Sequence, residues 1–253
     1  MSTSPRPLAI VSGGSRGLGY QSAIGLAERG FDLALIAKDP ERLLLAKRNI
    51  SAQFSNSQPD LVITTHPVDL ENQGATRKIA SEIAGSLRTP QVLVLAHGVM
   101  SEKMSKTLRT TDAEWNRVLA INLNSVFILV NELAPAMADA REGRIVIFSA
   151  CLGRMSGPGN TGGLAPYRIS KAGVNALVRN LAHETGLGAR GLLVDAICPN
   201  HSRTDMGGAD APRSAEEGAE TAIWLATGDL SERTVDGKIL TGLFWEDHQV
   251  IPW

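Results

Sequence analysis

Tyr167 and Lys171 are four residues apart in the segment Tyr-Arg-Ile-Ser-Lys. The apolar pattern around them predicts a helix over residues 166–185, and side chains at this spacing lie on one helix face. A neighbouring ammonium group stabilises a phenolate and lowers the tyrosine pKa, which suits the phenol for proton transfer near neutral pH. The pair therefore predicts acid–base chemistry, and the alternative is an ordinary pair of surface side chains.

A glycine-rich turn lies between the apolar run 8–11 and the next predicted helix. Glycine lets a backbone approach a phosphate closely, and the start of a helix offers free N–H donors and a positive dipole end. The alternative is a tight strand-to-helix turn without a ligand. The terminal Gly-Lys-Ser/Thr of a P-loop is absent, which argues against a P-loop NTPase. The residues expected to contact a phosphate-containing cofactor are Gly13, Ser15, Arg16, Gly17, Leu18 and Gly19.

The residues after the second apolar run, 31–37, indicate which dinucleotide would bind. A carboxylate at this strand end would hydrogen-bond the ribose 2′-hydroxyl of NAD, whereas a cation would receive the 2′-phosphate of NADP. Position 37 is alanine, Lys38 follows it, and Arg16 can reach the same region. We therefore expect NADP (NADPH) to be preferred over NAD. Two alternatives stay open: both cations are solvated surface charges, or Asp39 binds NAD.

The elements that position these residues follow from short apolar runs that alternate with longer helical patterns. This alternation is typical of a parallel sheet with crossover helices. The predicted strands cover residues 8–11, 31–37, 61–68, 92–96, 144–148, 192–198 and 240–245. The predicted helices cover residues 19–29, 40–53, 71–87, 111–137, 166–185 and 214–226. We expect one α/β domain over residues 1–253, a doubly wound, Rossmann-like parallel sheet with helices on both faces.

Two of these helices carry local end signals. The helix over residues 111–137 has Thr111 or Asp112 as its N-cap. Pro135 should end or bend it, because proline lacks an N–H and clashes with the preceding turn. The helix over residues 214–226 begins with Ser214 and Glu217, placed like an N-terminal capping turn.

Composition and charge argue against several classes of protein. Of the 253 residues, 43% are hydrophobic and 20% charged, enough apolar material for a folded core. Lys and Arg number 25 against 26 Asp and Glu, and this net charge of −1 argues against nucleic-acid or anionic-membrane binding. Two cysteines without CxxC spacing and five histidines without ligand spacing predict no disulfide framework and no metal. We expect a cytoplasmic protein, since there is no signal-peptide pattern and no apolar run approaches about 20 residues.

Several motifs occur together in a specific order, and they resemble the short-chain dehydrogenase/reductase family along nearly the whole chain. The motifs are Gly13-x3-Gly17-x-Gly19, Asp69 after the third strand, Asn122 in Ile-Asn-Leu, Tyr167 with Lys171, and Cys198-Pro199. The later segments 203–206 and 214–220 look like the carbonyl reductase branch of that family.

The resemblance implies a role for each matching residue. Tyr167 would give a proton to a substrate carbonyl oxygen as NADPH delivers hydride, and Lys171 would bind the nicotinamide ribose and lower the Tyr167 pKa. Asn122 would hold a water that links Lys171 to solvent, or be an ordinary polar helix residue. Asp69 would contact the adenine, or cap a helix. Thr204 would contact the nicotinamide amide, or cap a turn. Further cofactor contacts are implied for Leu70, Ala96, Gly98 and Pro199.

The chain departs from the family pattern at two places. The family's Asn-Asn-Ala-Gly reads Leu-Ala-His-Gly at residues 95–98, and His97 is either a substitute or merely packed. Counting back from Gly153, the family's carbonyl-polarising serine falls on Ala150, beside Ser149. We expect a shift by one residue that lets Ser149 supply the hydroxyl. Ser156 or Asn160 would otherwise substitute, or catalysis would be weak.

The sequence thus predicts an NADPH-dependent reductase of a ketone or aldehyde, or the reverse alcohol oxidation. Residues 201–213, rich in Gly and Ala, would form a lid and substrate wall. The alternative is a cofactor-binding protein that has lost catalysis and reports NADP(H) levels. An epimerase acting on nucleotide sugars is disfavoured, because little chain follows the sixth strand. The resemblance also implies a homodimer or homotetramer.

Overall fold

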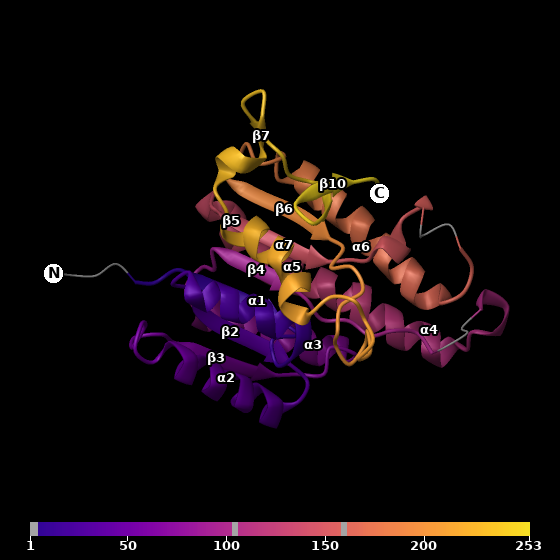
Figure 1. The fold of residues 1–253 in the computed structure, drawn as a ribbon, viewed down its shortest axis with the longest axis horizontal. Helices are drawn as coiled ribbons and strands as arrows, with labels where there is room; N and C mark the ends of the chain where they lie inside the picture. The colour runs from indigo at the N-terminus through magenta and orange to yellow at the C-terminus, as the bar shows by residue number, and fades with distance from the viewer. Residues whose placement is uncertain (1–4, 103–105, 158–160) are drawn as a thin grey trace.

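A computed structural model describes residues 5–102, 106–157 and 161–253. Its centre is an eight-stranded sheet in the order β10-β9-β6-β5-β4-β1-β2-β3 (Figure 1). All neighbouring strands in it are parallel except β10, which runs antiparallel to β9. The strands are β1 (Leu8–Ser12), β2 (Asp32–Ala37), β3 (Ile63–Pro67), β4 (Val92–Leu95), β5 (Gly143–Phe148), β6 (Leu192–Ile197), β9 (Phe244–Glu246) and β10 (Gln249–Ile251), with a separate hairpin of β7 (Thr234–Val235) and β8 (Lys238–Ile239).

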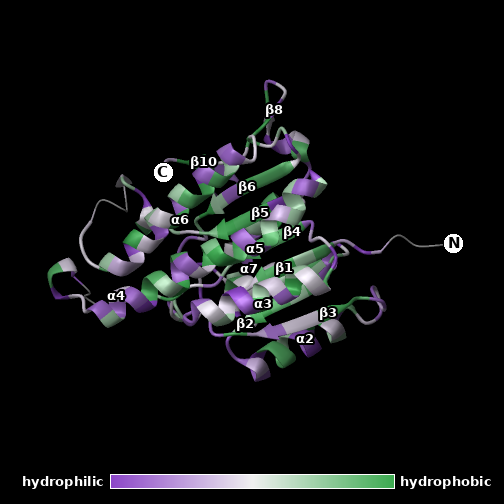
Figure 2. Ribbon diagram, turned by 180° about the vertical axis from the view of Figure 1, so that it is seen from behind, coloured by the Kyte–Doolittle hydropathy of each residue, from purple (hydrophilic) through white to green (hydrophobic). Residues whose placement is uncertain are grey.

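Helices cover both faces of this sheet. Helices α1, α2 and α7 lie on one face (Figure 1), and α3, α5 and α6 lie on the other (Figure 2). The helices are α1 (Gly17–Glu28), α2 (Pro40–Phe54), α3 (Gln73–Ser86), α4 (Asp112–Leu119), α5 (Ser125–Ala140), α6 (Ala165–Glu184) and α7 (Ala215–Thr227). The predicted doubly wound α/β fold is therefore confirmed.

The central strands form because their side chains are apolar on both faces. Every residue of β1, β2, β4 and β6 is buried, as expected for parallel strands covered by helices on each side. Figure 2 shows the hydrophobic character of β4, β5 and β6. The two faces hold two separate apolar cores, one under α1 and α7 and one under α3, α5 and α6.

The strand order reverses beside β1. This strand pairs with β2 on one side and with β4 on the other, so the chain winds outward in both directions from that point. In open α/β sheets, the loops after the two strands at such a reversal diverge and leave a crevice at their carboxyl ends. The glycine turn follows β1, so the topology places it at this crevice.

The long predicted helix is interrupted and also longer than expected. Thr111 is its N-cap, accepting a hydrogen bond from Glu114 N–H at 3.2 Å. A π-helical turn, Ala120–Asn124, separates α4 from α5. Pro135 is expected to end or bend this helix, and the helix does not end there, because α5 continues to Ala140. Buried side chains on both sides of Pro135, including Leu133 and Met137, hold this helix in the core and outweigh the lost hydrogen bond.

Among the described residues, one helical stretch, Asp112–Ala140, is long and apolar enough to cross a bilayer by length and composition alone. Of its most apolar window, 56% is buried inside the protein. The sequence-based expectation that no apolar run approaches about 20 residues does not include this stretch, because polar side chains interrupt its apolar residues. Its buried residues Val126, Leu129, Val130, Leu133, Ala134 and Met137 belong to the core beneath α3, α5 and α6, which is typical of a core helix.

The C-terminal part differs from the predicted single strand over residues 240–245. Gly242 adopts a φ of +72°, which breaks the extended backbone, so β9 begins only at Phe244. The chain then turns back as β10, and Trp253 stacks on Phe244 with ring centroids 5.5 Å apart. The predicted capping turn of α7 is confirmed, since Ser214 and Glu217 form a reciprocal capping box.

Candidate active site

A cleft of about 1020 Å³ lies where the loops after β1 and β4 diverge. Twelve of the predicted cofactor-binding residues line it: Gly13, Ser15, Arg16, Gly17, Leu18, Gly19, Lys38, Asp69, Leu70, Ala96, Gly98 and Thr204. Residues 203–206 of the predicted lid form part of its wall. The predicted residues Asn122, Ser149, Tyr167, Lys171 and Pro199 lie outside this lining.

The glycine turn has the geometry of a phosphate cradle. A Cβ on Gly19 would lie 2.4 Å from the carbonyl oxygen of Gly13, so the loop can fold against α1 only without a side chain there. Gly13 has a φ of +72°, which favours glycine. The N-cap residue Arg16 makes no side-chain capping bond, so the first amide N–H groups of α1 are left for another acceptor. These residues fit an anionic group such as a pyrophosphate.

The two cations predicted to select NADP are paired with carboxylates. Lys38 Nζ lies 2.6 Å from Asp69 Oδ2, and this contact raises the Lys38 pKa and lowers that of Asp69. Arg16 contacts Asp205, which lies on the predicted lid. Asp69 is not the N-cap of α3, because Asn72 occupies that position. The cleft therefore holds both cations together with carboxylates that compete for them.

Three charged residues that line the cleft, Arg42, Arg203 and Asp205, are not among the predicted site residues. Arg42 lines the cleft from the first turn of α2, and its Nη1 lies 3.6 Å from Asp205 Oδ2. A signal for Arg42 existed, because a helix that starts at Pro40 brings its first turn close to Lys38. No local sequence signal marks Asp205, whose position depends on the lid.

Tyr167 and Lys171 lie together on α6, buried behind the cleft. Their residues are 6% and 4% exposed, so the alternative of a surface pair is wrong. Lys171 Nζ lies 5.9 Å from the centroid of the Tyr167 ring and donates to the carbonyl oxygen of Phe148 at 2.7 Å. A Cβ on Gly98 would lie 3.5 Å from the same nitrogen. Gly98 lines the cleft and thus lies against the Lys171 ammonium group on the side that faces the protein interior.

The pKa values of this pair differ from the sequence-based expectation. Burial raises the pKa of Tyr167, with a further contribution from the nearby thiols of Cys198 and Cys151. Burial also lowers the pKa of Lys171 to about 8. The expected lowering of the Tyr167 pKa by Lys171 is thus not seen, because the ammonium group bonds Phe148 and burial removes water from the phenol.

Asn122 connects three segments around this pair. It lies in the π-helical turn, accepts from Val99 N–H at 2.8 Å and donates to Val99 O at 2.9 Å. It also donates to Ser170 Oγ at 3.1 Å, directly before Lys171 on α6. Asn122 therefore fixes the loop after β4 against the helix that carries Tyr167 and Lys171.

Thr204 and Pro199 belong to the chain between β6 and α7. Thr204 lines the cleft and also accepts a hydrogen bond from Gly207 N–H at 3.1 Å, so it caps a turn as well. The Pro199 carbonyl accepts from Ser202 Oγ at 2.9 Å, which stabilises the start of this segment.

Comparison with known proteins identifies the family. The sequence pattern of short chain dehydrogenases matches residues 7–215. The chain belongs to the short-chain dehydrogenase family. It is 32% identical to the 3-oxoacyl-(acyl-carrier-protein) reductase FabG of Staphylococcus aureus strain Mu50 over 78% of this chain and 75% of that protein. It is 30% identical to the FabG of Escherichia coli K12 over 79% of this chain and 75% of that protein.

Solved structures show the same fold. A blue fluorescent protein from a metagenomic library, in complex with NADPH, superimposes with a TM-score of 0.77 at 22% identity, over 94% of both chains. The resemblance drawn from the motifs is therefore confirmed for the family, whose members are oxidoreductases. The relatives named here are 3-oxoacyl reductases, so they do not support the carbonyl reductase branch in particular.

His97 stands at the alanine of the family's Asn-Asn-Ala-Gly pattern and connects two elements. Its Nδ1 lies 2.5 Å from Ser12 Oγ at the end of β1, and its Nε2 lies 2.7 Å from Ser125 Oγ at the start of α5. The Ser125 hydroxyl donates to Ile121 O, so its oxygen accepts from Nε2–H and Nδ1 accepts the Ser12 proton. Burial and then repulsion by Lys171 lower the His97 pKa to about 3, so the ring is neutral. His97 is a substitute with partners, not merely packed.

The second departure from the short-chain dehydrogenase pattern concerns the serine. The backbone stays extended through Ala150, at φ −160° and ψ 148°, so Ser149 and Ala150 point to opposite sides. The Ser149 hydroxyl faces α6, where it donates to Asn175 Oδ1 and lies 3.3 Å from Lys171 O. The expected register shift toward Ser149 is therefore wrong. Ser156 lies on an exposed loop, and Asn160 lies outside the described residues.

Proposed function

We propose that this protein reduces a ketone or aldehyde with NADPH, or oxidises the corresponding alcohol in reverse. The observation that carries the proposal is the buried Tyr167–Lys171 pair, whose ammonium group lies against Gly98, a residue that lines the cleft of about 1020 Å³. When bound, NADPH would supply the hydride. The glycine turn and the start of α1 would hold its phosphates.

In this proposal the phenol of Tyr167 gives its proton to the substrate oxygen. Its raised pKa keeps the phenol protonated at neutral pH, ready to donate. The neighbouring Lys171 ammonium would stabilise the phenolate that forms. Asn122 acts as a positioning residue, because it bonds both Val99 in the loop after β4 and Ser170, the residue before Lys171.

NADP is proposed as the preferred cofactor. Three cations, Arg16, Lys38 and Arg42, line one end of the cleft, and position 37 is alanine. A 2′-phosphate would compete with Asp69 and Asp205 for them. The NADPH complex of a protein with this fold is consistent with that choice.

The substrate class and setting are further proposals. The 3-oxoacyl reductases among the relatives make a 3-oxoacyl thioester the first carbonyl to test. The lid, residues 201–213, would form one wall of its site. We also propose a cytoplasmic homodimer or homotetramer, as the family resemblance implies.

The test is NADPH consumption with a panel of ketones, aldehydes, quinones and 3-oxoacyl thioesters. With any accepted substrate, Tyr167→Phe should lower kcat by about two orders of magnitude or more and leave NADPH affinity within a few-fold. Tyr20→Phe alters the chain's other tyrosine and is the matched control, expected to keep kcat. A Tyr167→Phe enzyme that retains more than about a tenth of the rate would require another proton donor.

A second candidate function follows from Ala150. The residue at the family's serine position has no hydroxyl, and Ser149 is bonded to α6 instead. A protein that binds NADP(H) and turns over slowly would fit this arrangement. An oxyanion donor contributes about 3 kcal/mol to a barrier. Ala150→Ser should therefore raise kcat if the family position is the one that acts, whereas Ser149→Ala should leave kcat within a few-fold. A tenfold loss in Ser149→Ala, with no gain in Ala150→Ser, would contradict this assignment.

A further inference from the structure

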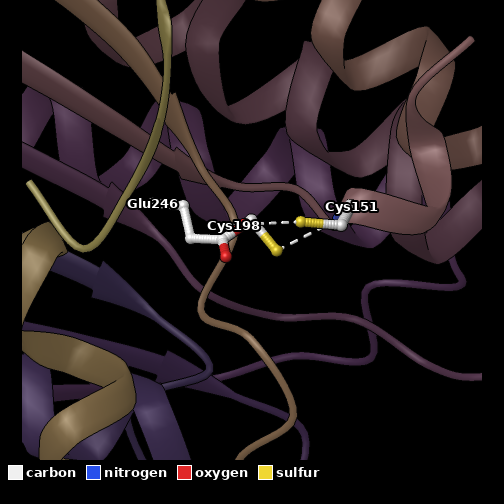
Figure 3. A group of neighbouring side chains, drawn as sticks. All are labelled: Cys151, Cys198 and Glu246. Atoms are coloured by element: carbon white, nitrogen blue, oxygen red, sulfur yellow. Dashed lines mark hydrogen bonds between the residues drawn. The ribbon is translucent and has the colours of Figure 1, made fainter. Parts of the chain in front are cut away.

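Two thiols and a carboxylate meet beside Tyr167, although no spacing in the sequence pointed to a metal site. The sulfur atoms of Cys151 and Cys198 and a carboxylate oxygen of Glu246 all lie within 4.8 Å of one another. Figure 3 shows them converging from three separate segments. Burial raises the pKa of Tyr167, and negative charge on either sulfur raises it further.

Sheet register brings the three residues together. Ile197 pairs with Trp245 in the β6–β9 ladder, so the next residues, Cys198 and Glu246, lie side by side. Cys198 N–H also donates to the carbonyl oxygen of Trp245 at 2.8 Å. Cys151 follows β5, the other neighbour of β6. The ligand atoms are thus held by rigid elements, as a preorganised site requires.

The hydrogen bonds inside the cluster match those of a thiolate site. Cys151 Sγ donates to Glu246 Oε2 at 2.7 Å. The Cys151 thiol, the backbone N–H of Asn200 and the backbone N–H of Cys151, at 3.1 Å, all lower the pKa of Cys198. Backbone N–H groups that donate to a sulfur are the kind of outer-shell support that metal-bound thiolates receive. The Cys151 thiol proton therefore lies beside a carboxylate and a second sulfur, which are groups that can also bind a cation.

We propose that Cys151, Cys198 and Glu246 form a binding site for a thiophilic divalent cation, of which Zn²⁺ is the representative. Tetrahedral Zn²⁺ with bonds of about 2.0–2.3 Å separates its ligand atoms by about 3.5–3.8 Å. The present separations bracket that spacing, since all three ligand atoms lie within 4.8 Å of one another and Cys151 Sγ lies 2.7 Å from Glu246 Oε2.

Binding would exchange protons for the metal. Both thiols become thiolates, and their two protons pass to solvent. Two thiolates and one carboxylate leave a fourth tetrahedral position for water or another ligand. Cys198 is buried, whereas Cys151 and Glu246 are partly exposed, which gives the ion a path from solvent.

Co²⁺ is the probe, because its thiolate complexes absorb visibly and in the near ultraviolet. The full-length protein is reduced, freed of metal with a chelator, checked for two reactive thiols, and titrated with Co²⁺ and then Zn²⁺. One equivalent of Co²⁺ should produce sulfur-to-cobalt charge-transfer bands with tetrahedral d–d bands. One equivalent of Zn²⁺ should abolish them.

Variants assign the ligands. The double variant with Cys151→Ser and Cys198→Ser should lose the charge-transfer bands. Glu246 is partly exposed, and Glu246→Gln should weaken Co²⁺ binding at least about tenfold, or about 1.4 kcal/mol. Asp247→Asn is the matched control: it alters the adjacent carboxylate, which pairs with Arg213, and should bind as the wild type does. Circular dichroism confirms that each variant is folded.

Absence of charge-transfer bands at one equivalent in the reduced wild type would overturn the proposal. Equal Zn²⁺ affinity in the wild type and the folded double cysteine variant would do the same. Neither outcome depends on turnover, so the result is independent of the proposed reductase activity.

Discussion

Replacing His97 with asparagine should change how stability depends on pH. The neutral ring has a folded-state pKa of about 3, against about 6.5 in the unfolded chain. Between these values the unfolded chain binds a proton that the folded protein does not. Acid therefore favours unfolding, at up to about 1.4 kcal/mol per pH unit. His97 alone should cost the wild type about 2 kcal/mol of unfolding free energy between pH 7 and pH 5.

Asparagine at position 97 has no such proton to bind. At pH 7 the variant should be less stable by about 1–3 kcal/mol, because it cannot span both Ser12 and Ser125 as the ring does. Its deficit relative to the wild type should then shrink by about 2 kcal/mol at pH 5.

Urea unfolding followed by circular dichroism at both pH values measures this difference. His183→Asn, on the exposed part of α6, is the control and should keep the wild-type dependence. A deficit for His97→Asn that is the same at pH 7 and pH 5 would refute the neutral, doubly bonded ring.

Three further predictions concern the cleft and the core. In equilibrium titrations, NADPH should bind at least about tenfold tighter than NADH, a difference of about 1.4 kcal/mol, and Lys38→Asp should erase or reverse that preference. Equal dissociation constants for the two cofactors in the wild type would contradict this prediction. Asp205→Asn frees Arg16 from an exposed ion pair worth about 0.2–1 kcal/mol, so NADPH should bind up to about fivefold tighter with NADH unchanged. Arg233→Met leaves Asp195 buried without its 2.9 Å partner and should cost about 3–5 kcal/mol in urea unfolding; a loss under 1 kcal/mol would count against a buried pair.

Much of the fold was predictable because its signals are local. The buried parallel strands are continuous apolar runs, and the turn Gly13–Gly19 follows the first of them. The spacing of Tyr167 and Lys171 places them on one helix face, whatever surrounds the helix. These features depend on neighbours in the sequence, so the sequence alone carries them.

The features that were mispredicted or missed depend on distant segments. The face to which Ser149 points depends on the extended backbone at Ala150 and on its partner Asn175. The pKa of Tyr167 depends on burial, which no spacing reports. The meeting of Cys198 with Glu246 depends on the register between β6 and β9. Pro135 is tolerated because tertiary packing holds its helix.

The π-helical turn that carries Asn122 has a consequence for how this protein can change. Each residue of a helix advances the side-chain direction by about 100°. Deleting Leu123 or Asn124, which follow Asn122 in this turn, would let α4 and α5 join as one regular helix, because a π turn holds about one residue more than an α-helical turn. The deletion would also turn the Asn122 side chain relative to α5. With α5 held in the core, Asn122 could no longer reach both Val99 and Ser170. The position of this amide thus depends on the length of the turn, so shortening the turn would move it even though Asn122 itself is unaltered.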